Sequence, residues 1–290
     1  MRRLLALAWL SLILAAGVAR AEPAMWTVRG PHATLILFGS MHLLPKGLDW
    51  EPPALSAAVA HADEIWFELP IDPATMSEVS RVIASRGELA KGDSLFNHLT
   101  PAQAARVRQA CDSLGVPPAL VTSMRPWLAE VTLSVAQDMK AGADAASGVE
   151  QQLSSQAPAS ARRRAFETVS DQIGFLADTT PQAQTASLDE TLDEMLTDPD
   201  LFHRVLEEWL AGDQAALSKD ALDPLAKTSP DMYRRLVTDR NRRWAARLSE
   251  RLQGDGVIVA VVGAGHLIGP GGVPALLRDR GFSVEGPAAH

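Results

Sequence analysis

The sequence predicts an α/β fold in which a small, mostly parallel sheet is formed by the two ends of the chain and a large helical insertion acts as a cap. Short apolar runs rich in branched residues, each closed by glycine, occupy residues 34–39 and 256–263. Such runs are typical of buried parallel strands. Between them, from about residue 73 to 252, the hydrophobic pattern is mostly helical. We expect this stretch to be the insertion.

Two more strands and one helix complete the predicted sheet region. The strands are expected at residues 64–69, stopped by Pro70, and at 282–285. A helix at 52–61 joins the first two strands into a βαβ unit. No internal repeat or linker divides the rest, so residues 22–290 are interpreted as one domain.

The first 21 residues have the pattern of a signal peptide. Arg2 and Arg3 precede an apolar run from residue 4 to 18, and the small-x-small triplet at 19–21 fits a cleavage site. The run is shorter than the roughly 20 residues that span a bilayer, and no cysteine follows to receive a lipid. We therefore expect a periplasmic or secreted protein without a stable membrane anchor.

Helix starts in the middle of the chain are marked by proline. Pro101, Pro126 and Pro199 each stand where a first helical turn is plausible, with Thr100 and Asp198 as N-cap residues. Residues 231–252 form an amphipathic pattern that leads straight into the strand at 256–263. One long helix is expected there.

Composition narrows the class of protein. With 47% hydrophobic and 21% charged residues the chain is globular, which excludes intrinsic disorder. The formal charge of -8 gives no basic surface for a phosphate backbone, so we expect no nucleic-acid partner. Cys111 is the single cysteine, so no internal disulfide can form, and its helical setting favours a buried apolar role over a nucleophilic one.

Two Gly-x-x-His segments follow the two apolar strands. His42 lies three residues after Gly39, and His266 lies three residues after Gly263. Ligands of open α/β sheets collect at the carboxyl ends of the strands, so two imidazoles delivered there can converge on one metal ion or substrate. Each segment alone is short and more simply interpreted as carrying a solvated or capping histidine. Their duplication at equivalent strand ends strengthens the case for a shared site, so both interpretations stay open.

Four further charged residues are ambiguous from sequence alone. Glu68 ends an apolar strand, where a carboxylate is costly unless paired, metal-bound or solvent-facing. Arg240 either pairs with nearby acids on a solvated helix face or points at developing negative charge. Glu150 and Glu167 are most simply interpreted as helix-start and surface carboxylates.

Together these segments resemble the TraB/PrgY/GumN family, in order, from about residue 26 to 285. The matching blocks are Phe38 to Pro45, Glu68, Gly148 to Glu150, Phe166 to Thr168 with Gln172, Trp209 to Asp213, Arg240 and Asn241 with Trp244, and Val262 to Gly269. The resemblance implies that His42 and His266 are the motif histidines, Glu68 their acidic partner and Arg240 the family's arginine. The family includes the Tiki proteins, described as metal-dependent proteases, and is related in fold to the erythromycin-esterase and ChaN-like proteins.

The leading hypothesis is an exported metal-dependent hydrolase that cleaves peptide or amide bonds in a peptide or protein substrate. His42, His266 and Glu68 would hold one divalent manganese, cobalt or zinc ion that activates water. Glu68 or Glu150 would accept the proton of that water, and Arg240 would stabilise the oxyanion. Two alternatives stay open: a metal-independent esterase-like hydrolase with a histidine base, and a non-enzymatic protein that binds haem or a peptide.

Overall fold

The computed structural model describes residues 22–287, so the predicted signal peptide at 1–21 lies outside the described residues. Six strands form one sheet in the order β6-β4-β7-β2-β1-β8, and β3 pairs with β5 in a small ribbon. The strands are β1 Met25–Arg29, β2 His32–Ser40, β3 Leu44–Pro45, β4 Glu64–Phe67, β5 Ala143–Asp144, β6 Arg162–Ala165, β7 Asp255–Gly263 and β8 Ser283–Glu285.

The sheet is mostly parallel and joins the two ends of the chain, as predicted. β2 pairs along its whole length with β7, and β7 and β6 flank β4, all in parallel. β1 is antiparallel to both β2 and β8. Because β7 lies between β2 and β4, the predicted βαβ crossover passes over a strand supplied by the other end of the chain.

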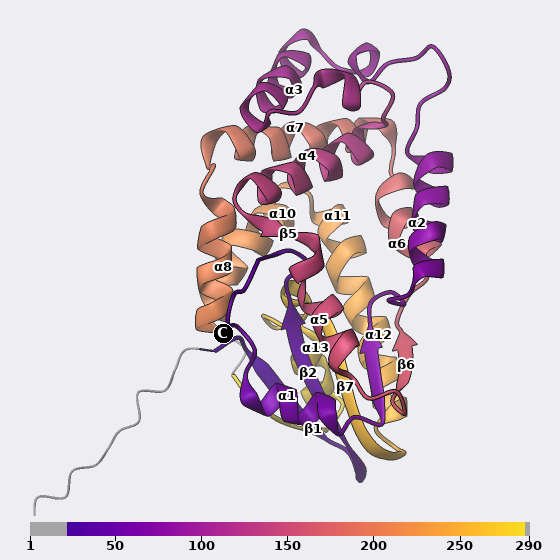
Figure 1. The fold of residues 1–290 in the computed structure, drawn as a ribbon, viewed down its shortest axis with the longest axis vertical. Coiled ribbons are helices and arrows are strands. Elements are labelled where there is room, and N and C mark those ends of the chain that lie inside the picture. Colours follow the sequence, from indigo (N-terminus) through magenta and orange to yellow (C-terminus); the bar gives the residue numbers. More distant parts are fainter. Residues whose placement is uncertain (1–21, 288–290) are drawn as a thin grey trace, which may run out of the picture.

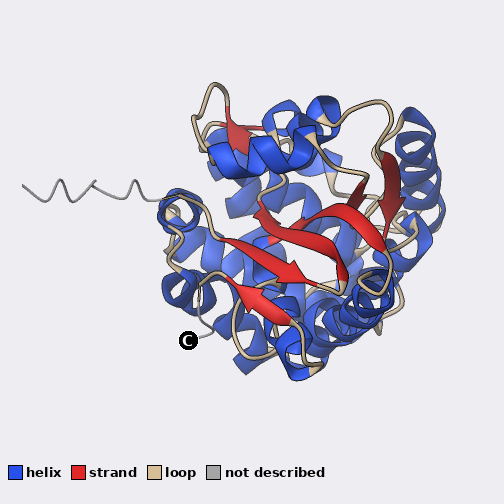
Figure 2. Ribbon diagram, turned by 90° about the horizontal axis from the view of Figure 1, so that it is seen from below, coloured by secondary structure: helices blue, strands red, loops and turns tan. Residues whose placement is uncertain are grey.

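Helices cover both faces of the sheet and extend beyond its carboxyl edge (Figures 1 and 2). They are α1 Pro53–Ala60, α2 Pro73–Arg86, α3 Pro101–Leu114, α4 Pro126–Lys140, α5 Val149–Gln156, α6 Val169–Ala177, α7 Pro181–Thr197, α8 Leu201–Ala211, α9 Gln214–Leu217, α10 Asp223–Thr228, α11 Pro230–Tyr233, α12 Asp239–Arg251 and α13 Val273–Asp279. None of the helices in residues 22–287 combines the length and the apolar character needed to cross a bilayer.

The cap has a hydrophobic core of its own. Helices α3, α4 and α7 pack together above the sheet (Figure 1), and their buried side chains form a cluster separate from the sheet core. Val107, Leu133 and Leu192 are fully buried there. Cys111 is buried in the same cluster, and burial raises the pKa of its thiol, which agrees with its predicted apolar role. The molecule therefore has two cores, with the carboxyl edge of the sheet between them.

Several elements differ from the predictions. The middle of the chain is not all cap, because β6 joins the main sheet from within it. Pro101 and Pro126 do begin helices, but Pro199 lies in the turn between α7 and α8, and Asp200 is the N-cap residue of α8. The helix expected at 231–252 is interrupted by a π-helical turn at Arg234–Thr238.

Candidate active site

The two Gly-x-x-His segments leave the sheet side by side. β2 and β7 are paired so that Gly39 faces Val262 and Ser40 faces Gly263. β4 is the other neighbour of β7 and leads directly to Glu68. The carboxyl ends of these three strands point at the cap (Figure 1), so His42, Glu68 and His266 are delivered to one edge.

Close backbone approach explains two of the glycines. A Cβ atom on Gly39 would lie 2.9 Å from the Cα of Ala264, so only glycine lets the two strand ends come this close. A Cβ on Gly148 would lie 2.1 Å from the carbonyl oxygen of His42. These two glycines let the first histidine segment approach both the second segment and the start of α5.

Arg240, on α12, is the centre of a buried polar network. Its Nε and Nη2 donate to the two oxygens of Glu167 at 2.9 and 2.8 Å, a bidentate pair. Nη2 also donates to Glu68 Oε2 at 2.5 Å. The exposed fractions of the Arg240, Glu68 and Glu167 side chains are 8%, 9% and 4%. Glu167 is therefore not the surface carboxylate expected from sequence.

Glu68 is held by three donors. Besides Arg240, the backbone N–H of Gly263 donates to Oε1 at 2.7 Å and the amide of Gln172 donates to Oε2 at 2.9 Å. Burial acts to raise the pKa of Glu68, but the positive charges around it and the Gly263 N–H outweigh burial and lower the pKa to about 2. At neutral pH those charges are Arg240 and protonated His42, and His266 adds to them only when it is protonated. The carboxyl group is therefore ionised, and the solvent-facing alternative is excluded.

His266 is held as a neutral imidazole with a defined tautomer. Asn241 donates from Nδ2 to the carbonyl of Gly271, so its Oδ1 accepts the Nδ1–H of His266 at 2.6 Å. Nε2 then carries the lone pair, which accepts from Arg240 Nη1 at 3.0 Å. Burial, together with the charge of Arg240, lowers the pKa of His266 to about 4. The same nitrogen lies 3.9 Å from Glu68 Oε1.

His42 forms a second polar group with Glu150 and Ser40. Glu150 Oε1 accepts from Ser40 Oγ at 2.5 Å and from His42 Nδ1 at 2.7 Å. The negative charge of Glu150 raises the pKa of His42 to about 9. Burial opposes ionisation of Glu150, but His42 and Ser40 keep its pKa below the usual value. At neutral pH this is an ion pair in which the imidazole is 67% exposed.

The two polar groups meet at one cavity of about 810 Å³, lined by His42, Glu68, Glu150 and Gln172 among others. Three carboxylates, from Glu68, Glu150 and Glu167, stand against the guanidinium of Arg240 and the protonated His42. Arg243 lies 3.8 Å from Glu167, so the charges of the whole site balance. Of the carboxylates, Glu68 and Glu150 line the cavity and are placed to attract an added cation.

A metal ion fits this donor set in chemistry but not in spacing. Metal-binding histidines usually donate their other ring N–H to an acceptor, and Glu150 and Asn241 provide such acceptors for His42 and His266. However, within residues 22–287 no three His, Cys, Asp or Glu side chains lie close enough to hold one ion. In this arrangement Arg240 donates to the His266 nitrogen that an ion would use.

The network gives roles to residues that sequence analysis did not single out as site residues. Asn241 holds His266. Trp244 packs against the His266 ring in a tilted arrangement, with centroids 4.5 Å apart, and donates to Glu167 at 3.1 Å. The sequence did contain a sign that Asn241 is buried. Arg240 and Asn241 fall in the same helical stripe as the buried Trp244, Ala245 and Leu248. Polar residues in an apolar stripe indicate buried partners.

Arg240 does not have the geometry expected of an oxyanion donor. Its Nε and both terminal nitrogens bond to Glu167, Glu68, His266 or the carbonyl of Leu236. These bonds hold Glu68 and His266 in place. The arrangement therefore favours a positioning role for Arg240.

The fold and site define a class: an α/β sheet with a helical cap and two Gly-x-x-His strand ends. The chain matches the TraB/PrgY/gumN family over residues 24–286, and it belongs to that family. It is similar to the proteins named YbaP of Escherichia coli (strain K12) and Shigella flexneri, each 26% identical over 244 residues, which are 83% of this chain and 87% of each relative. No solved structure gives a significant match.

Proposed function

We propose that this protein is an exported metal-dependent hydrolase that cleaves peptide or amide bonds in the cavity between sheet and cap. The observation that carries the proposal is the pair of imidazoles at one edge, each with Nδ1 bonded to a fixed acceptor, beside the cavity-lining carboxylates of Glu68 and Glu150. Metal-binding histidines usually have such an acceptor on the other ring nitrogen. Each Nε2 becomes a ligand once Arg240 releases His266 and His42 loses its proton. Export is proposed from the leader-like pattern at residues 1–21.

His42, His266 and Glu68 are the residues that would hold a divalent ion. When bound, such an ion would lower the pKa of a water ligand and polarise a carbonyl group. Holding all three residues on one ion requires His42 to turn inward and Arg240 to release His266. Turning His42 disturbs little packing, since its side chain is mostly exposed.

The remaining residues orient these groups and handle the proton. Glu150 faces the cavity, is ionised and bonds to His42, so it is placed to accept a proton from water or to pass one to a leaving amine. Glu167 and Asn241 hold Arg240 and His266, respectively.

The test is a hydrolysis screen of the purified mature protein against mixed peptide libraries, read by mass spectrometry. Activity should disappear with a chelator, return with manganese, cobalt or zinc, and fall at least a hundredfold in His42→Ala and Glu150→Gln. His61→Ala, a histidine at the end of α1 away from the site, should cleave as the wild type does. If the reconstituted protein cleaves nothing in the libraries, the proposal fails.

Metal-independent hydrolysis is a second candidate, favoured by the absence of a three-ligand group among residues 22–287. In that case His42, protonated at neutral pH beside Glu150, would act as a general acid toward the leaving group. Cleavage that is indifferent to chelator but abolished by His42→Ala would support this candidate over the first.

A further inference from the structure

The cavity at the carboxyl edge continues into an apolar groove beneath the cap. A second cavity of about 370 Å³ shares His42, Glu68, Leu69, Val79 and Gln172 with the first, so the two form one groove. His42, Glu68, Glu150 and Gln172 lie on its floor, and helices α2, α4 and α6 form its walls.

The walls of this groove are largely hydrophobic. α2 contributes Val79 and Ile83, α4 contributes Leu128 and Val131, and α6 contributes Ile173. Met76, one turn before Val79, lines the larger cavity and is 61% exposed. Large apolar side chains left this accessible around a polar site indicate a binding surface.

The apolar surface also continues along α4. Val131, Val135 and Met139 are spaced four residues apart, which places them on one stripe of the helix. Their exposed fractions are 39%, 38% and 57%. α4 runs across the cap above the sheet (Figure 1), so the exposed apolar stripe continues along the helix from Val131, which lines the groove.

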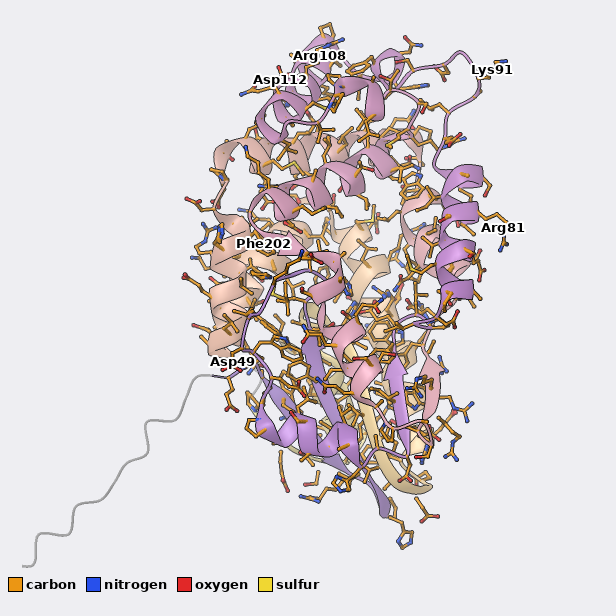
Figure 3. All side chains as sticks on the ribbon, in the orientation of Figure 1. Asp49, Arg81, Lys91, Arg108, Asp112 and Phe202 are labelled. Atoms are coloured by element: carbon orange, nitrogen blue, oxygen red, sulfur yellow. The ribbon has the colours of Figure 1, made fainter. Side chains whose placement is uncertain are left out.

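The opposite face of α2 is polar. Figure 3 shows Arg81 pointing away from the body of the molecule, and Ala84, one turn further on, is exposed on the same face. α2 is therefore amphipathic, with its apolar side toward the groove although little of that side is buried. The apolar side has no covering element among the described residues that would bury Met76.

The floor of the groove demands hydrogen-bonding partners. Glu68 already has three donors, but Glu150 is bonded only through Oε1 and His42 only through Nδ1. Glu150 Oε2 and His42 Nε2 therefore have no hydrogen-bond partner among the described residues, and both side chains line the cavity. A hydrocarbon chain laid across them would leave these atoms unpaired. A peptide backbone offers N–H and C=O groups in alternation, and its side chains can project to the apolar walls.

We infer that the groove binds an extended peptide segment through large apolar side chains seated against α2 and α4, with its backbone over the carboxylate floor. This inference rests on the proposed function, since it names the substrate class of the same site. It adds a specificity: aliphatic and aromatic side chains near the scissile bond are preferred, and acidic ones are rejected because the apolar walls offer them no partner. Val79 and Val131 are the specificity-determining residues.

The test measures binding without turnover, by fluorescence anisotropy of labelled hexapeptides in the presence of a chelator. A Leu- and Phe-containing peptide should bind at least tenfold more tightly than its Ser- and Glu-substituted versions. Equal affinity of the apolar and polar peptides, no binding of any peptide, or binding of laurate in place of the apolar peptide would each overturn the inference.

Two variants localise the effect. Val79→Asp should weaken the apolar peptide by about tenfold or more, because it places a charge on the groove wall. Ala84→Asp puts the same charge on the outward face of α2 and should leave affinity within about twofold. If both variants bind as the wild type does, the assigned wall is wrong. If Val79→Asp does not fold, Val131→Ser replaces it. The comparison of apolar and polar peptides on the wild-type protein tests the inference even without these variants.

The peptide-binding inference and the hydrolase proposal can fail independently of each other. A protein that cleaves polar and apolar peptides alike refutes the specificity and leaves the hydrolase intact. A protein that binds apolar peptides as inferred but never cleaves them refutes the hydrolase and leaves the groove intact.

Discussion

Replacing Arg240 by methionine should destabilise the folded protein strongly, because the guanidinium neutralises two buried carboxylates. Arg240 makes two hydrogen bonds to Glu167 and one to Glu68, and all three side chains are at most 9% exposed. Removing one partner of such a buried pair costs about 3–5 kcal/mol, since the charges left behind are uncompensated. For a domain of this size that loss corresponds to a fall in Tm of roughly 6–20 °C.

Urea unfolding at pH 7, followed by tryptophan fluorescence, measures the effect. Arg243→Met is the matched control: Arg243 is on the same helix and 3.8 Å from Glu167, but it is 52% exposed, so its loss should cost no more than about 1 kcal/mol. Adding Glu167→Gln to Arg240→Met should recover part of the stability, because it removes one of the stranded charges. A loss below about 1 kcal/mol in Arg240→Met would refute the buried network.

Three other predictions follow from the electrostatics and the two cores. The free energy of unfolding should fall by about 3 kcal/mol from pH 6.5 to 4. In this range His266 takes up a proton in the unfolded chain but not in the folded protein, where its pKa is about 4. Urea titrations of the wild type and His266→Gln check this, and identical pH profiles of the two would contradict it. Glu150→Gln should bring the pKa of His42 down from about 9 toward its ordinary value, as followed by NMR titration, and an unchanged pKa would show that Glu150 is not the cause. Leu133→Ala, in the cap core, should cost about 2–5 kcal/mol, whereas Val135→Ala on the exposed stripe should cost under about 1 kcal/mol; equal losses in urea unfolding would argue against a separate cap core.

The elements that sequence predicted best are those whose local pattern matches their environment. β2 and β7 are buried on both faces, and a continuous apolar run is the sequence pattern that such strands have. β6 was missed because Arg162, Arg163 and Arg164 carry no apolar alternation; it is an exposed edge strand, held by pairing to β4 and by the contact of Arg162 with Glu64. Both contacts join β6 to residues far away in the sequence, so the sequence of the segment alone does not predict the strand.

β1 was missed for a different reason. Trp26 and Val28 are buried and alternate with more exposed neighbours, which is a strand pattern, but the segment is very short.

The helix start near Pro199 was predicted at the wrong residue, because acidic residues on both sides of this proline can serve as caps. Local capping rules do not choose between adjacent candidates.

At the site, sequence located the residues that end strands but not those that hold them. His42, Glu68 and His266 were found because each closes an apolar run, and parallel pairing then brings the run ends to one edge. The partnership of Glu167 with Arg240 joins residues far apart in the chain, so only folding reveals it. Asn241 was accessible in principle, as a polar residue in a buried stripe.

Binding of one cation by the two histidines and Glu68 is tested most directly by the metal content of the purified protein, measured by inductively coupled plasma mass spectrometry after equilibration with manganese, cobalt or zinc and removal of free ion. We expect about one equivalent in the wild type and in His61→Ala, and near-complete loss in both His42→Ala and His266→Ala. An absence of bound metal in the wild type, or full retention in both variants, would contradict it.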